Sequence, residues 1–135
     1  MITALLLLLA APGDELPACN KKEAEMGIQQ AMNQCAYRDY MIADRELNAQ
    51  WRLTRAEMQR RDAEWTSGYD DGRPGYFETL LEAQRAWLAY RDAQCRSEAY
   101  DFRGGSMEPL IDATCKAALT RARTEELRQL AETYG

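Results

Sequence analysis

Four cysteines, Cys19, Cys35, Cys95 and Cys115, are the residues with the most definite chemistry in this sequence. An even number of cysteines in a small chain with an apolar N-terminal segment is typical of two disulfides in an exported protein. A zinc site is the alternative, but the chain contains no C-x-x-C pair and no histidine. Of the three pairings that four cysteines allow, we predict Cys95–Cys115 and Cys19–Cys35, because each pair encloses a predicted bend.

The absence of histidine also bears on catalysis. Histidine is the commonest general base and the commonest metal ligand in proteins. Two glutamates one helical turn apart, Glu78 and Glu82, come nearest to the carboxylate pair of a glycoside hydrolase. Glutamate-rich helix faces are usually only solvated. We therefore expect no enzymatic activity, no metal site and no cofactor.

A few polar residues fall on an otherwise apolar helix face. Gln84 and Arg91 are seven residues apart and share this face with leucine, tryptophan and cysteine side chains. A buried arginine normally requires a carboxylate partner, and Asp44 on the preceding helix is the predicted one, with Glu46 behind it. We assign Asp44, Asn48, Gln84 and Arg91 to a structural polar core that fixes the helix register. A surface cluster that binds a partner is the alternative.

These residues lie on three predicted helices. The first covers about residues 22–65, where proline is absent and Gly27 is the only glycine, so a break is expected near Gly27. Its apolar residues recur in steps of three and four, which is typical of one buried helix face. The predicted buried face consists of Ile28, Met32, Cys35, Tyr40, Ala43, Leu47, Trp51, Thr54, Met58 and Trp65.

Two glycine-rich joints separate the three helices. The run at 67–75 ends the first helix, and Gly104-Gly105-Ser106 follows the second, with Pro109 acceptable in the first turn of the third. The second buried face is predicted to hold Phe77, Leu80, Leu81, Gln84, Trp87, Leu88, Arg91 and Cys95. The third is predicted to hold Ile111, Cys115, Ala118, Leu119, Ala122, Leu127, Leu130 and Tyr134. No strand pattern is present, so we predict an all-α fold: a long antiparallel helical hairpin with a third helix packed across it and two disulfides.

The N-terminal segment has features of an export signal. Residues 4–11 form an apolar run that is too short to span a bilayer but long enough for the core of a signal peptide. Small residues at Ala11 and Gly13 predict a signal peptide at 1–13 and a domain at 19–135, although no Lys or Arg precedes the apolar run. A buried N-terminal helix and a lipid anchor at Cys19 are the alternatives, since residues 16–19 loosely resemble a lipoprotein cleavage box.

The charge of the chain restricts the class of partner. The net charge is −5 and the isoelectric point is about 4.8. Nucleic acids require clustered Lys and Arg, so we expect no nucleic-acid binding. An acidic protein associates faster with a basic protein partner. No basic face accompanies the apolar stripes, so we expect neither a membrane-surface role nor a transmembrane segment.

Several segments together are similar to one known family. Residues 83–95, AQRAWLAYRDAQC, resemble the signature AQRAW-x-x-[FY]RDA-x-C of the LprI-like lysozyme-inhibitor family. Residues 32–51 are similar to its C-A…AD-x-ELN-x-x-Y segment, with Trp51 in the usual Tyr position. Residues 104–109 resemble its G-S turn, and residues 115–127 resemble its C-x-x-x-x-T-x-x-R-x-x-x-L close. The resemblance implies a mainly helical fold.

The resemblance also implies a periplasmic or secreted protein that inhibits lysozyme or another cell-wall hydrolase. Such an inhibitor needs only to occupy the lysozyme cleft, where two carboxylates work. A loop that carries a hydrogen-bond donor or a cation suits this cleft. Our candidates are the loop at 67–75 with Arg73 and the turn with Gly105 and Ser106. A cell-envelope structural or adaptor domain without catalysis is the alternative function.

Overall fold

The structure, a computed structural model, describes residues 15–65 and 71–132 of the chain. Within these ranges the regular structure is entirely helical. The elements are α1 (Lys21–Glu25), α2 (Gln29–Glu64), α3 (Tyr76–Ala99), the short 3₁₀ helix η1 (Tyr100–Phe102) and α4 (Glu108–Glu132).

The break that separates α1 from α2 lies at Gly27, as predicted. Gly27 has a φ of 83°, in the left-handed region where a side chain would be strained. Asn20 begins α1, because its side-chain oxygen accepts a hydrogen bond from the backbone N–H of Glu23 at 3.1 Å. Beyond the break, α2 runs without interruption for 36 residues, a length of about 54 Å.

The start of α3 is held by a residue of α2. The carboxylate of Asp62 accepts hydrogen bonds from the backbone N–H groups of Tyr76 and Phe77, at 2.7 and 3.1 Å. A negative charge at this position satisfies free N–H groups and complements the helix dipole. Gly75 leaves room for this contact, since a Cβ there would lie 2.6 Å from the Asp62 Oδ1 atom. The tip of the hairpin is therefore fastened by a side chain 14 residues away.

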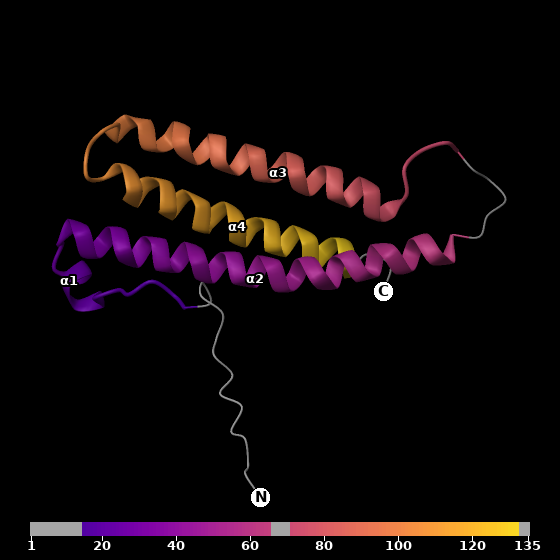
Figure 1. The fold of residues 1–135 in the computed structure, drawn as a ribbon, viewed down its shortest axis with the longest axis horizontal. Coiled ribbons are helices and arrows are strands. Elements are labelled where there is room, and N and C mark those ends of the chain that lie inside the picture. Colours follow the sequence, from indigo (N-terminus) through magenta and orange to yellow (C-terminus); the bar gives the residue numbers. More distant parts are fainter. Residues whose placement is uncertain (1–14, 66–70, 133–135) are drawn as a thin grey trace, which may run out of the picture.

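The long helices lie side by side in an elongated bundle (Figure 1). α3 runs antiparallel to α2, and α4 returns in the direction of α2. The predicted all-α fold, with an antiparallel helical hairpin, a third packed helix and two disulfides, is confirmed. The structure adds that α4 packs most extensively against α2 and also contacts α3, whereas α2 and α3 contact each other least.

The apolar core lies where the three long helices meet. Leu47, Met58, Leu80 and Leu127 are buried together, and half-buried Trp51, Phe77 and Trp87 pack against them. Thr54 is completely buried beside this cluster and donates its hydroxyl hydrogen to the carbonyl of Leu127 at 2.8 Å. This bond between α2 and α4 satisfies a polar group that would otherwise be costly to bury.

Some residues of the predicted buried faces are exposed instead. On α4, Ala118, Ala122 and Leu130 face solvent, and the buried positions are Ala113, Cys115, Ala117, Thr120, Arg123 and Leu127. Ile28, Trp65 and Leu88 are likewise exposed. The prediction for α4 is confirmed for Cys115 and Leu127 but wrong for the two alanines and Leu130, because alanines occur on several faces of this helix. The buried Thr120 and Arg123 were missed because they are polar.

The predicted signal peptide at 1–13 and Tyr134 lie outside the described residues. None of the helices in the described part of the chain is long and apolar enough to cross a membrane.

Candidate functional site

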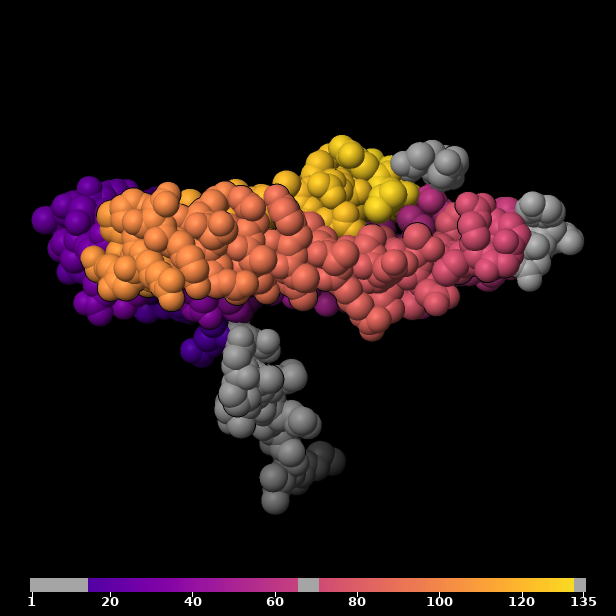
Figure 2. Space-filling model, turned by 90° about the horizontal axis from the view of Figure 1, so that it is seen from above, coloured from indigo at the N-terminus to yellow at the C-terminus, as the bar shows by residue number. Residues whose placement is uncertain are grey.

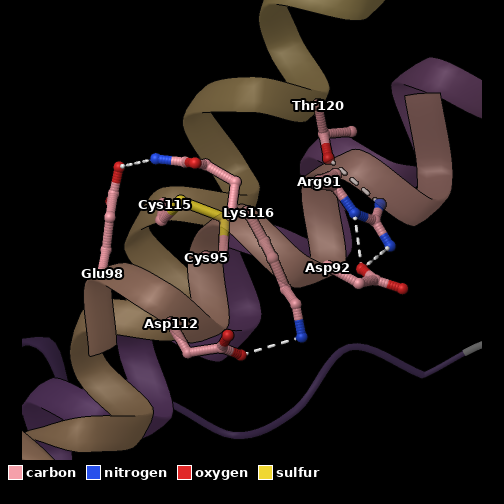
Figure 3. The surroundings of a disulfide bond; sticks show 9 residues. Arg91, Asp92, Cys95, Glu98, Asp112, Cys115, Lys116 and Thr120 are labelled. Atoms are coloured by element: carbon pink, nitrogen blue, oxygen red, sulfur yellow. Dashed lines mark hydrogen bonds and ion pairs between the residues drawn. A yellow bond between two sulfur atoms is a disulfide. The ribbon is translucent and has the colours of Figure 1, made fainter. Parts of the chain in front are cut away.

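Both disulfides form as predicted, and together they fasten one end of the bundle. Cys19–Cys35 ties the segment before α1 to α2, and Cys95–Cys115 ties α3 to α4 (Figure 3). No free cysteine is left. Because the sulfur of Cys19 is bonded to Cys35, it is not available in this structure for a lipid anchor.

Arg91 lies one helical turn from the Cys95–Cys115 disulfide and is 5% exposed (Figure 3). Its guanidinium carbon lies 5.3 Å from the ring centroid of Tyr40 on α2 and 5.2 Å from that of Trp87 on α3. Both distances are typical of cation–π contacts. The same group donates to the hydroxyl of Thr120 on α4 at 3.3 Å, so Arg91 contacts all three long helices.

The carboxylate that pairs most closely with Arg91 is not the predicted one. Arg91 donates twice to Oδ1 of its neighbour Asp92, at 3.0 and 2.9 Å. The predicted partner Asp44 is 3.9 Å away, at the limit of an ion pair, and its side chain is 33% exposed. Asn48 donates to Asp44 at 3.4 Å but is itself exposed. The sequence thus predicted the burial of Arg91 and its long ion pair with Asp44, but not its closer contacts.

Gln84, the fourth residue of the predicted polar core, belongs to a different contact. Its side-chain oxygen accepts a hydrogen bond at 2.9 Å from Arg123, a buried residue of α4 that the sequence analysis missed. Arg123 also forms an ion pair with Glu126 at 2.9 Å, and its Nη2 atom has no hydrogen-bond partner among the described residues. Its position, three residues after Thr120 and four before Leu127, puts Arg123 on their buried helix face, and this spacing could have predicted its burial.

The two candidate binding loops lie at opposite ends of the bundle (Figure 1). The described part of the first loop holds Arg73, which is bound to Asp71 by an ion pair at 2.5 Å and by a backbone hydrogen bond at 3.0 Å. The backbone hydrogen bond runs from the N–H of Arg73 to the carboxylate of Asp71. The side-chain hydrogen bond between the two residues lowers the pKa of Asp71 and raises that of Arg73, so both are charged at neutral pH and the pair carries no net charge. Residues 67–70 of this loop are outside the described ranges.

The second candidate, the turn between α3 and α4, carries a different set of side chains. A shallow open depression is lined by Tyr100, Asp101, Phe102, Arg103, Gly105, Ser106 and Met107. The guanidinium of Arg103 lies over the ring of Tyr100 at 4.7 Å, and Phe102 is 41% exposed. Arg103 forms no ion pair with the described residues, so its charge is available to a partner.

Three contacts hold this turn in place. The backbone carbonyl of Ser106 accepts a hydrogen bond from Asn33 of α2 at 2.9 Å. The backbone N–H of Gly104, whose φ is 80°, donates to the carboxylate of Glu108 at 2.6 Å. The Cys95–Cys115 disulfide bridges the two helices that the turn connects. The turn is therefore fixed before any partner arrives.

Comparisons of the sequence with known proteins identify its family. The sequence model of the family described as "Lysozyme inhibitor LprI" matches residues 19–127, which include all four cysteines. The chain belongs to the LprI lysozyme-inhibitor family. It is also similar to an uncharacterized protein of Rhizobium meliloti (strain 1021), with 44% identity over 132 residues that cover 96% of this chain and 91% of the relative. No solved structure matches the chain.

Part of the LprI signature lies in the interior of this structure. Trp87, Arg91 and Cys95 of the AQRAWLAYRDAQC segment all contact another helix or lie in the core. The segment thus specifies how α3 attaches to its neighbours in an LprI domain. Within the described residues no group of His, Cys, Asp and Glu side chains could hold a metal ion.

Proposed function

We propose that this chain is an exported protein that binds a lysozyme, or a related cell-wall hydrolase, and inhibits it without any chemistry of its own. The observation that carries the proposal is the match of the lysozyme-inhibitor family to residues 19–127, the stretch from the first cysteine to the core residue Leu127. The match therefore covers a whole folded unit and not one shared motif.

The disulfides support the compartment. Two disulfides that account for every cysteine of a small chain persist in the periplasm or outside the cell, where thiols are not kept reduced. The net charge of −5 favours association with basic proteins. A disulfide-bonded acidic domain is thus suited to meet a cell-wall hydrolase.

The binding element that the geometry favours is the turn between α3 and α4. An arginine and an aromatic ring that project from a rigid turn are typical of the residues that dominate protein interfaces. Arg103 forms no ion pair within the described residues, and the cleft of a lysozyme contains two carboxylates. Arg73 is a weaker candidate, because Asp71 already neutralises it.

A lysis assay tests the function. Bacterial cell walls are mixed with lysozymes of several types, and the fall in turbidity is followed with and without the purified, disulfide-bonded protein. We expect lysis by at least one type to slow at micromolar protein. Undiminished lysis by every type would overturn the proposal and favour the cell-envelope adaptor alternative.

Matched arginine variants locate the site. Arg103→Ala is expected to raise the inhibitory concentration by on the order of tenfold or more, the effect of losing one interface hot spot. Arg73→Ala, at the opposite end of the bundle, is the control and should leave inhibition unchanged. Ser106→Ala should also be neutral, because Asn33 binds the backbone carbonyl of Ser106 and not its side chain. If only Arg73→Ala weakens inhibition, the binding element is the hairpin tip instead.

A further inference from the structure

One face of α3 is uncharged along its whole length. Its members are all exposed, follow one another in steps of three and four residues, and run from the first residue of α3 to the residue just after its end. We call this face the α3 stripe, which consists of Tyr76, Thr79, Ala83, Ala86, Tyr90, Ala93, Ser97 and Tyr100. Figure 2 looks onto α3 from the side away from α2, and no other described segment lies over the helix.

The α3 stripe differs from the other exposed helix surfaces of the protein. The outer surface of α4, for example, carries Arg128 between Glu125 and Glu132, as expected of a solvated face. Steps of three and four with small or aromatic side chains are instead the pattern by which one helix packs against another. The buried side of α3 uses Leu80, Arg91 and Cys95, so the stripe takes no part in the packing of the described bundle.

The order of residues in the α3 stripe reads almost the same in both directions. If two copies of α3 align antiparallel, Tyr76 meets Tyr100 of the second copy and Thr79 meets Ser97. Further in, Ala83 meets Ala93, and Ala86 meets Tyr90. Each large side chain near the centre thus faces a small one, which lets the two helices approach closely without voids.

The charges that flank the α3 stripe are complementary in the same alignment. Glu82 comes one residue before Ala83, and Arg96 comes three residues after Ala93, so both lie on the same side of the stripe. In an antiparallel pair, flanking residues on that side face each other across the seam. Glu82 then meets Arg96 of the second copy, and the same contact repeats by symmetry. Neither residue forms an ion pair within the part of the chain that the structure describes.

We propose that α3 is a homodimerisation helix, which packs antiparallel against α3 of a second copy about a two-fold axis near Ala89. Such a pair is closed and uses the same surface on both chains. The stripe extends for about 36 Å. A single helix face forms a small interface, so we expect reversible association with a dissociation constant on the order of 10 µM. This assembly is proposed independently of the inhibition, and its seam ends at Tyr100, the ring over which Arg103 lies.

Sedimentation equilibrium of the disulfide-bonded protein tests the interface. We expect wild-type protein at about 10 µM to be a mixture of monomer and dimer, and Ala86→Glu to be largely monomeric at the same concentration. Two carboxylates would enter the seam opposite Tyr90 and weaken the affinity by about tenfold or more. Ala122→Glu is the matched control, since Ala122 is an exposed alanine of α4, and it should dimerise like the wild type. Both variants should keep the wild-type circular dichroism and melting temperature. A wild-type monomer, or a dimer that Ala86→Glu leaves intact, would overturn the proposal.

A charge exchange tests the antiparallel alignment. Glu82→Arg places two pairs of like charges across the seam and should weaken the dimer by on the order of tenfold at low salt. Combining Glu82→Arg with Arg96→Glu restores opposite charges at both contacts and should restore the wild-type dissociation constant. If the double variant is as weak as the single one, these two residues do not face each other and the alignment is wrong.

Discussion

Truncation of Arg91 is the substitution that best distinguishes cation–π contacts from ion pairing as sources of stability in this fold. Arg91→Ala removes a buried guanidinium that contacts α2, α3 and α4 at once. The carboxylates near it, Asp92 and Asp44, have side chains 46% and 33% exposed, so neither is left as a buried, unpaired charge. The loss of stability must therefore come from the aromatic contacts and from Thr120.

The magnitude follows from these contacts. A desolvated cation–π contact contributes about 1 kcal/mol, and Arg91 makes one with Tyr40 and one with Trp87. The lost hydrogen bond to the fully buried Thr120 contributes about 1 kcal/mol more. Burying the charged guanidinium costs desolvation free energy, and Arg91→Ala removes this cost, which offsets part of the loss. We expect Arg91→Ala to lower the free energy of unfolding by about 2–3 kcal/mol, or the melting temperature by roughly 10 °C.

Two companion variants distinguish stacking from charge pairing. Arg91→Lys keeps the positive charge but lacks the flat guanidinium, and should lose about half as much stability as Arg91→Ala. Asp44→Asn removes a distant, partly exposed charge and should change stability by less than about 0.5 kcal/mol. Urea unfolding followed by circular dichroism measures all three variants on one scale.

Two outcomes would refute this reasoning. An unchanged melting temperature for Arg91→Ala would mean that Arg91 is not enclosed by the two rings. A loss in Asp44→Asn equal to that in Arg91→Ala would mean that the ion pair between α2 and α3, and not the stacking, holds the helices together.

Two other predictions concern the links between helices. Replacing both Cys95 and Cys115 by alanine should lower the free energy of unfolding by about 3 kcal/mol, since this disulfide closes a loop with a sequence separation of 20; urea unfolding that matches the oxidised wild type would contradict this. Hydrogen bonds from Arg121 hold the pKa of Asp39 below its ordinary value. The folded state therefore binds fewer protons than the unfolded state, so this pair stabilises the fold above about pH 4 and loses its effect as the pH falls through the lowered pKa. Asp39→Asn should remove under about 1 kcal/mol at neutral pH, because both side chains are about half exposed. The loss should shrink as the pH falls below about 4; a loss that is the same at neutral and acidic pH would exclude the charge as the cause.

The family resemblance located the fold more firmly than the binding surface. Trp87, Arg91 and Cys95 stand in the most recognisable segment, and all three serve the attachment of α3 to its neighbours. The proposed contact residues Phe102 and Arg103 lie just outside that segment, on an exposed turn. Residues that bind a partner from a short turn leave no helical periodicity in the sequence, because the turn presents no helix face.

The sequence by itself determined the helices and their breaks, whereas the cysteine pairs were a prediction that the structure confirms. Glycines at 27 and 104 mark backbone with positive φ, and this requirement is local. The burial of Arg91 could also be read from the sequence, because helical spacing placed it among apolar residues.

Only the tertiary structure decided which groups meet. It placed Arg91 against rings from two helices. It also showed that Gln84 accepts a hydrogen bond from Arg123 and that Asp62 caps the start of α3. It also set the two candidate loops at opposite ends of the bundle and left the α3 stripe exposed. Helical periodicity records which side of a helix is apolar, but alanine is compatible with both core and surface. Partners on other helices depend on crossing angle and depth of packing, which no single segment encodes.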